Sequence, residues 1–384
     1  MIVVGGGIGG TATALALARR GCTVRLLEQA PEFGEVGAGL QVGPNVMRVL
    51  DRLGVMDAVM EIAFLPRSLV LKDALDGSEV TTVDLGDAFR RRFGYPYATI
   101  HRADLHAVLV DACRDTGRVL LEPSRRVTGF SQDGTGVEVL CEGQTEPNRA
   151  DVLIAADGLW SQTRSVIVGD GDPRVTGQVA YRAVLPRAEV DDDLYSESVV
   201  LWAGPKLHLA HYPLRRGELF NMGAIFHSLR FDAGANTYGD PDELHERFAV
   251  TCDPVRRLVA RIEEWRMWVL RDREPVATWT DGRVALLGDA AHPTLQYLAQ
   301  GAGMAIEDAW VLGELLGQAD DAPSWLRAYQ DQRSVRTARV TLLSRLYGEL
   351  YHADGMAREV RRDMLRGWEG PRTHESFAWL YDGI

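Results

Sequence analysis

The chain has 384 residues, 46% of them hydrophobic and 25% charged, with a formal net charge of −12 at pH 7. This composition is typical of a water-soluble globular protein, and its acidic balance argues against nucleic acid or an anionic membrane as the main partner. No uncharged run reaches the ~20 residues that a membrane span requires.

Four cysteines are scattered along the chain and form no CxxC pair. They also lack the histidine spacing of a metal site, so no metal is expected. Reduced thiols in a cytoplasmic enzyme are the interpretation that this pattern favours.

The first elements form a strand–turn–helix–strand unit. An apolar run over 1–4 predicts a strand, 11–20 a helix and 23–27 a second strand. The turn between the first strand and the helix has the spacing G-x-G-x-x-G. Its residues are predicted to bind a dinucleotide, and they are Gly5, Gly7, Ile8, Gly9 and Gly10.

Each glycine of this turn has a physical purpose. Gly5 permits a tight turn, Gly7 lets the backbone approach a pyrophosphate, and Gly10 permits close packing of the helix. The start of the helix then offers free N–H groups and a partial positive charge to the phosphates.

An acidic residue ends the second strand. Glu28 lies 21 positions after Gly7, where a carboxylate can accept hydrogen bonds from ribose hydroxyls. With its neighbour Gln29 it is predicted to bind the ribose end of FAD or NAD, because a 2′-phosphate would be repelled.

The middle of the chain changes character. Helices are predicted over 43–53 and 101–116, with a mixture of strands and turns over 66–98. A buried strand over 151–156 leads into Asp157-Gly158. Alternating patterns then predict four strands of a mostly antiparallel sheet, over 178–185, 198–202, 206–212 and 218–226.

The last part returns to nucleotide-binding patterns. A short buried strand over 284–287 leads into Gly288-Asp289, and helices are predicted over 303–316 and 324–350. The tail over 368–384 is polar and aromatic, and its pattern predicts weak structure.

The segments that resemble a nucleotide site flank the sheet segment in sequence. This order predicts an α/β fold with a discontinuous Rossmann-like FAD-binding domain over 1–70, 99–174 and 272–345. An inserted substrate domain, mostly antiparallel β-sheet, is predicted over 71–98 and 175–271, and a C-terminal helical segment over 346–384.

Three motifs occur in a characteristic order: the glycine turn, Asp157-Gly158 and Gly288-Asp289. Together they resemble the single-component FAD-dependent aromatic hydroxylases of the para-hydroxybenzoate hydroxylase fold. The resemblance implies tightly bound, non-covalent FAD and a transient NADH or NADPH that the Asp157 segment helps to bind. The absence of a second glycine turn agrees with a reductant that binds and leaves.

The resemblance also implies roles along the FAD. Arg102 would join Glu28 on the adenosine and phosphate side, and Asp289 would hold the ribityl and pyrophosphate region. A further glycine-rich turn would place helix N–H groups near the flavin N1 and C2 oxygen, where reduced flavin is negative. That turn comprises Gly301, Ala302 and Gly303.

In this family NAD(P)H reduces FAD, and O2 then adds to give a flavin C4a-hydroperoxide that attacks an electron-rich ring. A phenolic ring reacts fastest as its phenolate, so the site needs a base or a hydrogen-bonding group near the hydroxyl. It must also exclude water.

One strand carries candidates for that task. His208 and Tyr212 share a face of the strand over 206–212, ~13 Å apart, while His211 faces the opposite side and is expected to point outward. Gln296 lies in the loop between Asp289 and the flavin-facing helix, where it can reach the space above the flavin. Ordinary sheet packing is the alternative for His208 and Tyr212.

The stretches around these residues, 204–213 and 292–301, resemble the 3-hydroxybenzoate 6-hydroxylase family, as do 92–97 and 101–106. The resemblance implies NADH-dependent conversion of the small phenolic acid 3-hydroxybenzoate to gentisate. His208 and Gln296 would polarise the phenol, Tyr212 would orient the ring or its carboxylate, and Pro293 would shape the pocket. Which residue contacts phenol and which contacts carboxylate stays open.

Other functions also fit the motifs. A salicylate-type or hydroxypyridine carboxylate hydroxylase shares all three, as does a hydroxylase of a larger aromatic natural product. A flavin dehydrogenase or reductase, which transfers no oxygen, is a different class, and a nonenzymatic nucleotide-binding module is the least favoured. A homodimer with a contact from Leu342 onward is one expectation for the C-terminal segment, and a cover for the FAD domain is the other.

Overall fold

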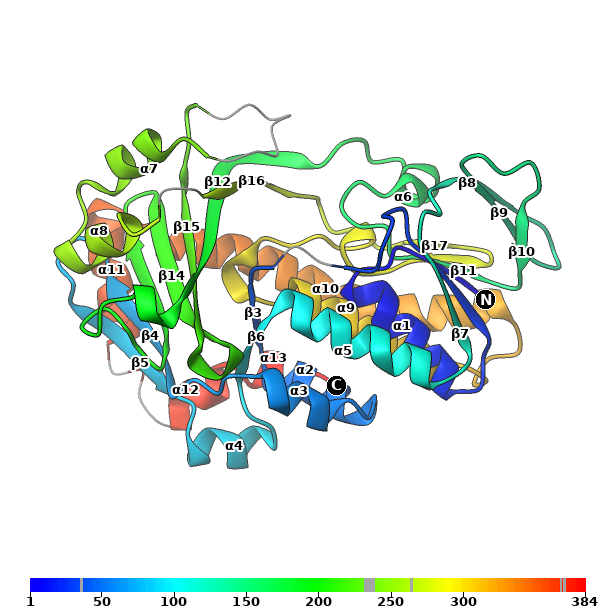
Figure 1. Cartoon of the computed structure of the whole chain (residues 1–384), viewed down its shortest axis with the longest axis horizontal. Coiled ribbons are helices and arrows are strands. Elements are labelled where there is room, and N and C mark those ends of the chain that lie inside the picture. The colour runs from blue at the N-terminus through cyan, green and yellow to red at the C-terminus, as the bar shows by residue number, and fades with distance from the viewer. Residues whose placement is uncertain (35–36, 231–238, 263–264, 367, 369–370) are drawn as a thin grey trace.

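Two large sheets lie at opposite ends of the molecule, and long helices run between them (Figure 1). The computed structural model describes residues 1–34, 37–230, 239–262, 265–366, 368 and 371–384. Within that part of the chain, no helix is both long and apolar enough to cross a membrane.

The first sheet has six strands in the order β17-β18-β11-β1-β2-β7, all parallel except for β17. Its central strands are buried on both faces, which explains their continuous apolar sequences. The strands are β1 (Ile2–Val4), β2 (Val24–Leu27), β7 (Val119–Glu122), β11 (Leu153–Ala155), β17 (Thr280–Asp281) and β18 (Val284–Leu286).

Helices cover this sheet, and α1 packs against both α5 and α9. The alanine- and leucine-rich sequence of α1 suits this position, because nearly all of its residues are buried. The helices of this half are α1 (Ile8–Arg19), α2 (Pro44–Arg52), α3 (Met56–Ile62), α5 (Arg102–Asp115), α6 (Gln162–Ile167), α9 (Gly301–Leu315) and α10 (Ala322–Tyr351), with the short turns η3 (Gly288–Ala290) and η4 (Gln296–Leu298).

Two small sheets border the first one. They are the pair β3 (Gly39–Val42) and β6 (Ala98–His101), and the three-stranded β8 (Val127–Gln132), β9 (Val137–Cys141) and β10 (Asn148–Ala150).

The second large sheet has seven strands in the order β16-β12-β15-β14-β13-β4-β5. Neighbours are antiparallel except for β13 and β4, so the prediction of a mostly antiparallel sheet is confirmed. Its strands are β4 (Ser68–Asp73), β5 (Glu79–Asp84), β12 (Arg174–Pro186), β13 (Val199–Gly204), β14 (Leu207–Leu214), β15 (Leu219–His227) and β16 (Arg266–Asp272).

One face of this sheet packs on an apolar core that includes Phe226, Phe248 and Trp265. The elements near the sheet are α4 (Asp87–Phe93), α7 (Pro241–Phe248) and α8 (Asp253–Val259), with the short turns η1 (Arg187–Glu189) and η2 (Arg215–Gly217). The other face is turned toward the first half of the molecule.

The C-terminal part is helical, with α11 (Gly355–Leu365), α12 (Pro371–Ser376) and α13 (Ala378–Tyr381). The prediction of a weakly structured tail is wrong for its described residues. Tyr381 is buried and packs edge-on against Phe89 and Phe93 of α4. The domain boundaries predicted at 71 and 346 fall inside β4 and α10.

Candidate functional site

The glycine turn between β1 and α1 is so tight that side chains would collide there. Gly5 has a φ of +99°, and a Cβ on it would lie 2.2 Å from the carbonyl oxygen of Ala156. A Cβ on Gly10 would lie 1.8 Å from the carbonyl oxygen of Gly5. Gly10 does not line the cavity; it lets α1 start close to the strand, so that Gly7 and Ile8 face the open space.

Glu28, at the end of β2, is held by the same turn. Its carboxylate accepts hydrogen bonds from the backbone N–H of Gly6 at 2.6 Å and of Ala30 at 2.7 Å. A carboxylate has about four acceptor sites, so Glu28 keeps capacity for ribose hydroxyls. Both Glu28 and Gln29 line the cavity.

Asp157 follows β11 and also lines the cavity. Its Oδ1 is buried and has no hydrogen-bond partner among the described residues, and burial raises the pKa of this carboxyl group. A buried acceptor without a donor marks a place where a ligand can supply one.

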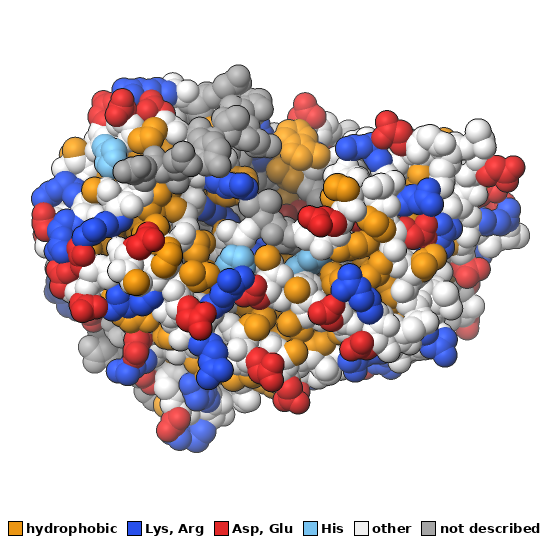
Figure 2. All heavy atoms as spheres, in the orientation of Figure 1, with side chains coloured by type: hydrophobic (Ala, Val, Ile, Leu, Met, Phe, Trp, Pro, Cys, Tyr) orange, Lys and Arg blue, Asp and Glu red, His pale blue; other side chains and the backbone are white. Residues whose placement is uncertain are grey.

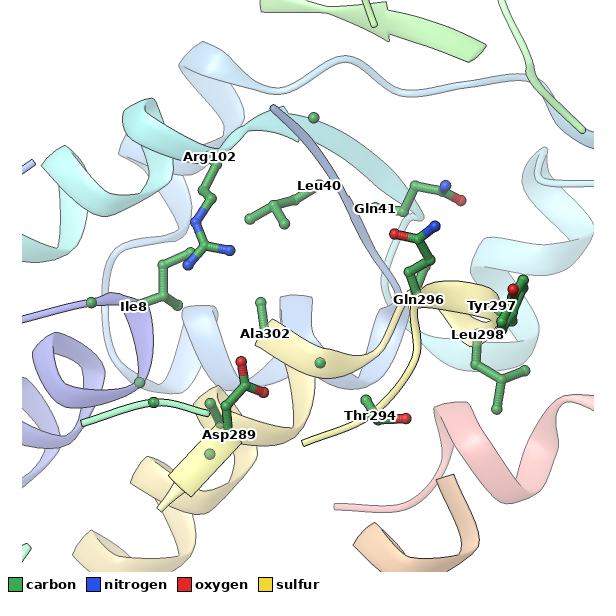
Figure 3. Close-up of a pocket in the computed structure, with 18 of the residues that line it drawn as sticks. Ile8, Leu40, Gln41, Arg102, Asp289, Thr294, Gln296, Tyr297, Leu298 and Ala302 are labelled. Carbon is green, nitrogen blue, oxygen red and sulfur yellow. The ribbon is translucent and has the colours of Figure 1, made fainter. Parts of the chain in front are cut away.

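Asp289 lies in η3, directly after β18. Figure 3 shows its carboxylate and the guanidinium of Arg102 entering the same open space, near Ile8 and Ala302. The loop that carries Asp289 is fixed from behind, because buried Arg164 donates to the carbonyl oxygens of Ala290 and Ala291, at 2.9 and 2.6 Å.

A buried ion network holds the other side of this loop. Asp308 of α9 accepts hydrogen bonds from the N–H of Gly288 at 3.1 Å and from Arg333 at 2.7 Å, and it pairs with His292 at 2.7 Å. Arg333 also pairs with Glu307 at 2.7 Å. This network was not predicted from the sequence. Charged residues inside an otherwise apolar helical pattern could have indicated it.

The N-terminus of α9 reaches the cavity, and Ala299 turns the chain into it with a left-handed φ of +53°. Gly301 and Ala302 line the cavity. Gly303 does not: it packs on α2, where an added Cβ would lie 2.8 Å from Val46. Pro293 is also absent from the lining, and the next residue, Thr294, takes that position.

The open face of the seven-stranded sheet forms the far wall. His208, Ala210 and Tyr212 of β14 all line the cavity, which confirms the predicted alternation. His211 faces away from the cavity, but it is buried rather than outward. Its ring packs against Phe220, and the indole N–H of Trp202 donates to its Nε2 at 3.1 Å. Burial lowers the pKa of His211 to about 3.

Arg182 of β12 is a further cavity residue that sequence reasoning missed. The register places Arg182 opposite Gly223, and Gly223 opposite Ala210, so small residues leave space beside the arginine on the cavity wall. Its guanidinium lies 5.6 Å from the ring of Trp268, and no ion pair with a described carboxylate is present. A cation at a strand position that faces the interior could have indicated this residue from the sequence.

Arg182 also fixes Gln296. Its guanidinium donates to Gln296 Oε1 at 2.6 Å, while Gln296 Nε2 is buried and has no partner among the described residues. In Figure 3 the Gln296 side chain extends from η4 toward Gln41, whereas Tyr297 and Leu298 lie at the end away from Arg102. Gln296 therefore has a free N–H donor.

Tyr212 sits tightly against β3. A Cβ added to Gly39 would lie 2.4 Å from Tyr212 Cε2. Burial raises the pKa of Tyr212 to about 12, which keeps it a neutral phenol.

The lining groups described above surround one cavity of about 1290 Å³, which extends from the glycine turn to the sheet face. Figure 2 shows the molecule hollowed between its two halves, with acidic and basic side chains mixed over both. The volume exceeds the ~300–1,000 Å³ typical of a single small-ligand site. The glycine turn, the two helix N-termini and the orphaned Asp157 oxygen fit FAD along one part, which leaves the sheet side for a second ligand. Among the described residues, no cluster could hold a metal ion.

These features define a dinucleotide-binding protein with a second ligand site beside the cofactor. The family model described as FAD binding domain matches residues 1–344. The 3-hydroxybenzoate 6-hydroxylase of Polaromonas naphthalenivorans is 44% identical over 99% of this chain and 95% of its own.

Two solved structures are similar over the whole chain. A single-residue variant of Klebsiella pneumoniae HpxO, complexed with FAD, has a TM-score of 0.88 and 28% identity, and covers 100% of this chain and 98% of its own. A salicylate hydroxylase substrate complex has a TM-score of 0.84 and 27% identity, over 99% and 94% of the two chains. The chain belongs to the FAD binding domain family, and it is an FAD-dependent monooxygenase with the fold of the flavoprotein hydroxylases.

Proposed function

We propose that this enzyme hydroxylates 3-hydroxybenzoate to gentisate, with NADH as the transient reductant and O2 as the oxygen source. The observation that carries the proposal is the pairing of a cation, Arg182, with a free amide donor, Gln296, on the cavity wall beyond the flavin segments. A phenolic acid has a carboxylate and a hydroxyl that suit these two groups.

The cofactor segments supply binding and orientation. Glu28 and Arg102 would hold the adenosine and phosphate side, Asp289 the ribityl side, and the N-terminus of α9 the flavin ring. Bound FAD, once reduced, supplies the activated oxygen. Asp157, with its raised pKa and unpartnered oxygen, is proposed to serve FAD and the visiting nicotinamide.

The phenol would lie near His208 and Gln296. Arg182 holds Gln296 Oε1, so the unpartnered Nε2 is the part of the amide left to donate to the ligand. A donor stabilises a phenolate oxygen more than a neutral hydroxyl, and the phenolate is the form that the oxygen transfer requires. Gln296 is therefore proposed to favour ionisation of the substrate.

Arg182 is proposed to bind the carboxylate. Burial lowers the pKa of its guanidinium, which shows that the cation is held in a poorly solvated place. An anionic ligand would offset that cost. Tyr212 would pack against the ring and orient it.

The substrate assay is direct. Purified enzyme with bound FAD is mixed with NADH and, in turn, 3-hydroxybenzoate, salicylate, 4-hydroxybenzoate and a hydroxypyridine carboxylate. Stimulated NADH oxidation with gentisate as product supports the proposal. Turnover of salicylate alone, with release of carbon dioxide, would refute it.

The role of Arg182 has its own test. Arg182→Gln should raise KM for 3-hydroxybenzoate about 30-fold, equivalent to about 2 kcal/mol of lost charge pairing, while Arg182→Lys should retain part of the affinity. The analogue 3-hydroxybenzyl alcohol, which lacks the carboxylate, should show little change in KM. Arg187→Gln, at a half-buried cation just beyond the end of β12 and outside the cavity lining, is the control. Equal losses for both ligands would contradict carboxylate binding.

We also propose that the enzyme acts in the cytoplasm as a homodimer. All four cysteines are free. Exposed apolar side chains follow helical spacing on α10 and α11, and they are Val335, Leu342, Leu346, Met356, Val360 and Met364. Leu346 and Met364 also line the cavity, whereas the other four lie outside its lining, and apolar side chains exposed in this way favour a second copy as their cover. Sedimentation of wild type and Val360→Lys tests this, because a dimer formed by this surface should dissociate in the variant.

A further inference from the structure

A second histidine lies directly behind His208. His208 Nδ1 is 2.8 Å from Nε2 of His352, and both side chains are buried. His352 comes from the end of α10, 144 residues later in the chain. Its backbone is also fixed: the carbonyl oxygen accepts from the N–H of Lys206, and its own N–H donates to Gly348.

Gln178 determines which nitrogen of His352 carries the proton. The Tyr297 hydroxyl donates to Gln178 Oε1, so the amide nitrogen faces the histidines. That nitrogen lies 3.4 Å from His352 Nδ1 and 3.0 Å from His227 Nε2. An amide nitrogen only donates, so both imidazole nitrogens must accept.

These acceptor roles fix the proton positions of the two histidines, one after the other. With Nδ1 accepting, neutral His352 carries its hydrogen on Nε2 and donates it to His208 Nδ1. His208 must then carry its own hydrogen on Nε2, and no described residue bonds that nitrogen. Burial lowers the pKa of His352 to about 3 and that of His208 well below its usual value, so both rings are neutral near pH 7.

We infer that His352 and Gln178 are positioning residues that fix the tautomer of His208, so that His208 presents an Nε2–H to the aromatic substrate. His208 thus stabilises the phenolate oxygen by donating a hydrogen bond, and it does not remove the phenol proton as a base. The substrate binds as the phenolate, with its proton left in bulk water. This inference rests on the proposed function for the identity of the ligand, but the tautomer itself is a property of the protein.

The tautomer can be read directly with FAD-bound enzyme whose histidines carry ¹⁵N, because protonated and bare imidazole nitrogens have distinct NMR shifts. The signals of His208 are assigned by their loss in His208→Gln. The expected result is a protonated Nε2 and a bare Nδ1, without any substrate present. A bare Nε2 in the wild type would overturn the inference.

Gln178→Glu should reverse the whole chain of hydrogen bonds. A carboxylate accepts from His352 Nδ1–H, so His352 Nε2 becomes bare and His208 carries its hydrogen on Nδ1. Gln330→Glu introduces the same change at another buried glutamine and should leave the tautomer unaltered. An unchanged tautomer in Gln178→Glu would overturn the assignment to Gln178.

Kinetics give a second readout. His352→Ala should lower kcat for the identified substrate on the order of 100-fold, as for loss of a hydrogen bond to an oxyanion, with little change in KM. His352→Gln, whose amide can still donate to His208 Nδ1, should recover much of the rate. Equal rates in the two variants would argue for a merely structural role. Because the NMR result needs no substrate, it stands even if the substrate proves not to be 3-hydroxybenzoate.

Discussion

Replacing Arg333 tests whether the buried ion network stabilises the fold and also supports FAD binding. It is 1% exposed and bridges two carboxylates, Glu307 and Asp308, that are both fully buried. Arg333→Met would leave both carboxylates without their shared cation. Removing one partner of a buried ion pair costs about 3–5 kcal/mol.

The partners that remain decide where in this range the cost falls. Glu307 keeps Arg336 and Asn45, and Asp308 keeps His292 and the N–H of Gly288. We therefore expect about 3 kcal/mol of lost stability. For a chain of 384 residues this corresponds to a fall in Tm of roughly 4 °C.

The assay is thermal unfolding with constant excess FAD, together with the flavin that stays bound after desalting. Bound flavin should decrease, because Asp308 fixes the loop that carries Asp289. Arg366→Met, at an exposed pair with Asp363, is the control and should change stability by less than about 0.5 kcal/mol.

A double variant tests the physical reason. Arg333→Met combined with Asp308→Asn removes one of the uncompensated charges and should recover part of the lost stability. If Arg333→Met behaves like Arg366→Met, or if the double variant recovers nothing, the argument from buried charge is refuted.

Three further predictions concern the turn, the ring pocket and pH. Gly10→Ala should yield protein without bound flavin, seen by absorbance, since its Cβ would lie 1.8 Å from the Gly5 oxygen; normal flavin content would contradict the close-packing argument. Gly39→Ala should displace Tyr212 and raise KM for the aromatic acid with flavin content unchanged, and an unaltered KM would count against Tyr212 as a ring contact. Burial lowers the pKa of His211 to about 3 in the folded protein, against 6.5 in the unfolded chain. Between these two values the unfolded chain binds more protons, so stability should fall as the pH drops from about 6.5 to 3. His211→Gln, which keeps an acceptor for Trp202, should flatten the pH dependence of denaturant unfolding; an identical slope would show that His211 does not contribute.

Local patterns explain why much of the cofactor site could be predicted. The glycine turn, Glu28 and Asp289 each belong to a short segment in which strand, turn and helix follow one another, so spacing alone places them. The alternation in β14 likewise placed His208 and Tyr212 on one face. Gly10, Gly303 and Pro293 lie beside the cavity rather than in its lining, because shaping a turn and touching a ligand give the same sequence pattern.

Contacts between distant segments could not be predicted in this way. His352 meets His208 across 144 residues, and nothing near either residue indicates the other. His211 is covered by Trp202 and Phe220 from the two adjacent strands. In the tail, Phe377 and Tyr381 stand four residues apart, which is helical spacing. The surface on which this short helix forms comes from distant segments, including the aromatic residues of α4 and Tyr97.

Because β1 is a central strand, the six-stranded sheet can be completed only after its later strands have been synthesised. This strand is synthesised before the others of its sheet, yet it lies at the centre, between β2 and β11, and β11 in turn needs β18. His352, just after α10, follows later still and completes the wall behind His208. The cavity lining therefore combines the first turn of the chain with Asp289 and the N-terminus of α9, so the cofactor segments are all present only after about 300 residues have been synthesised.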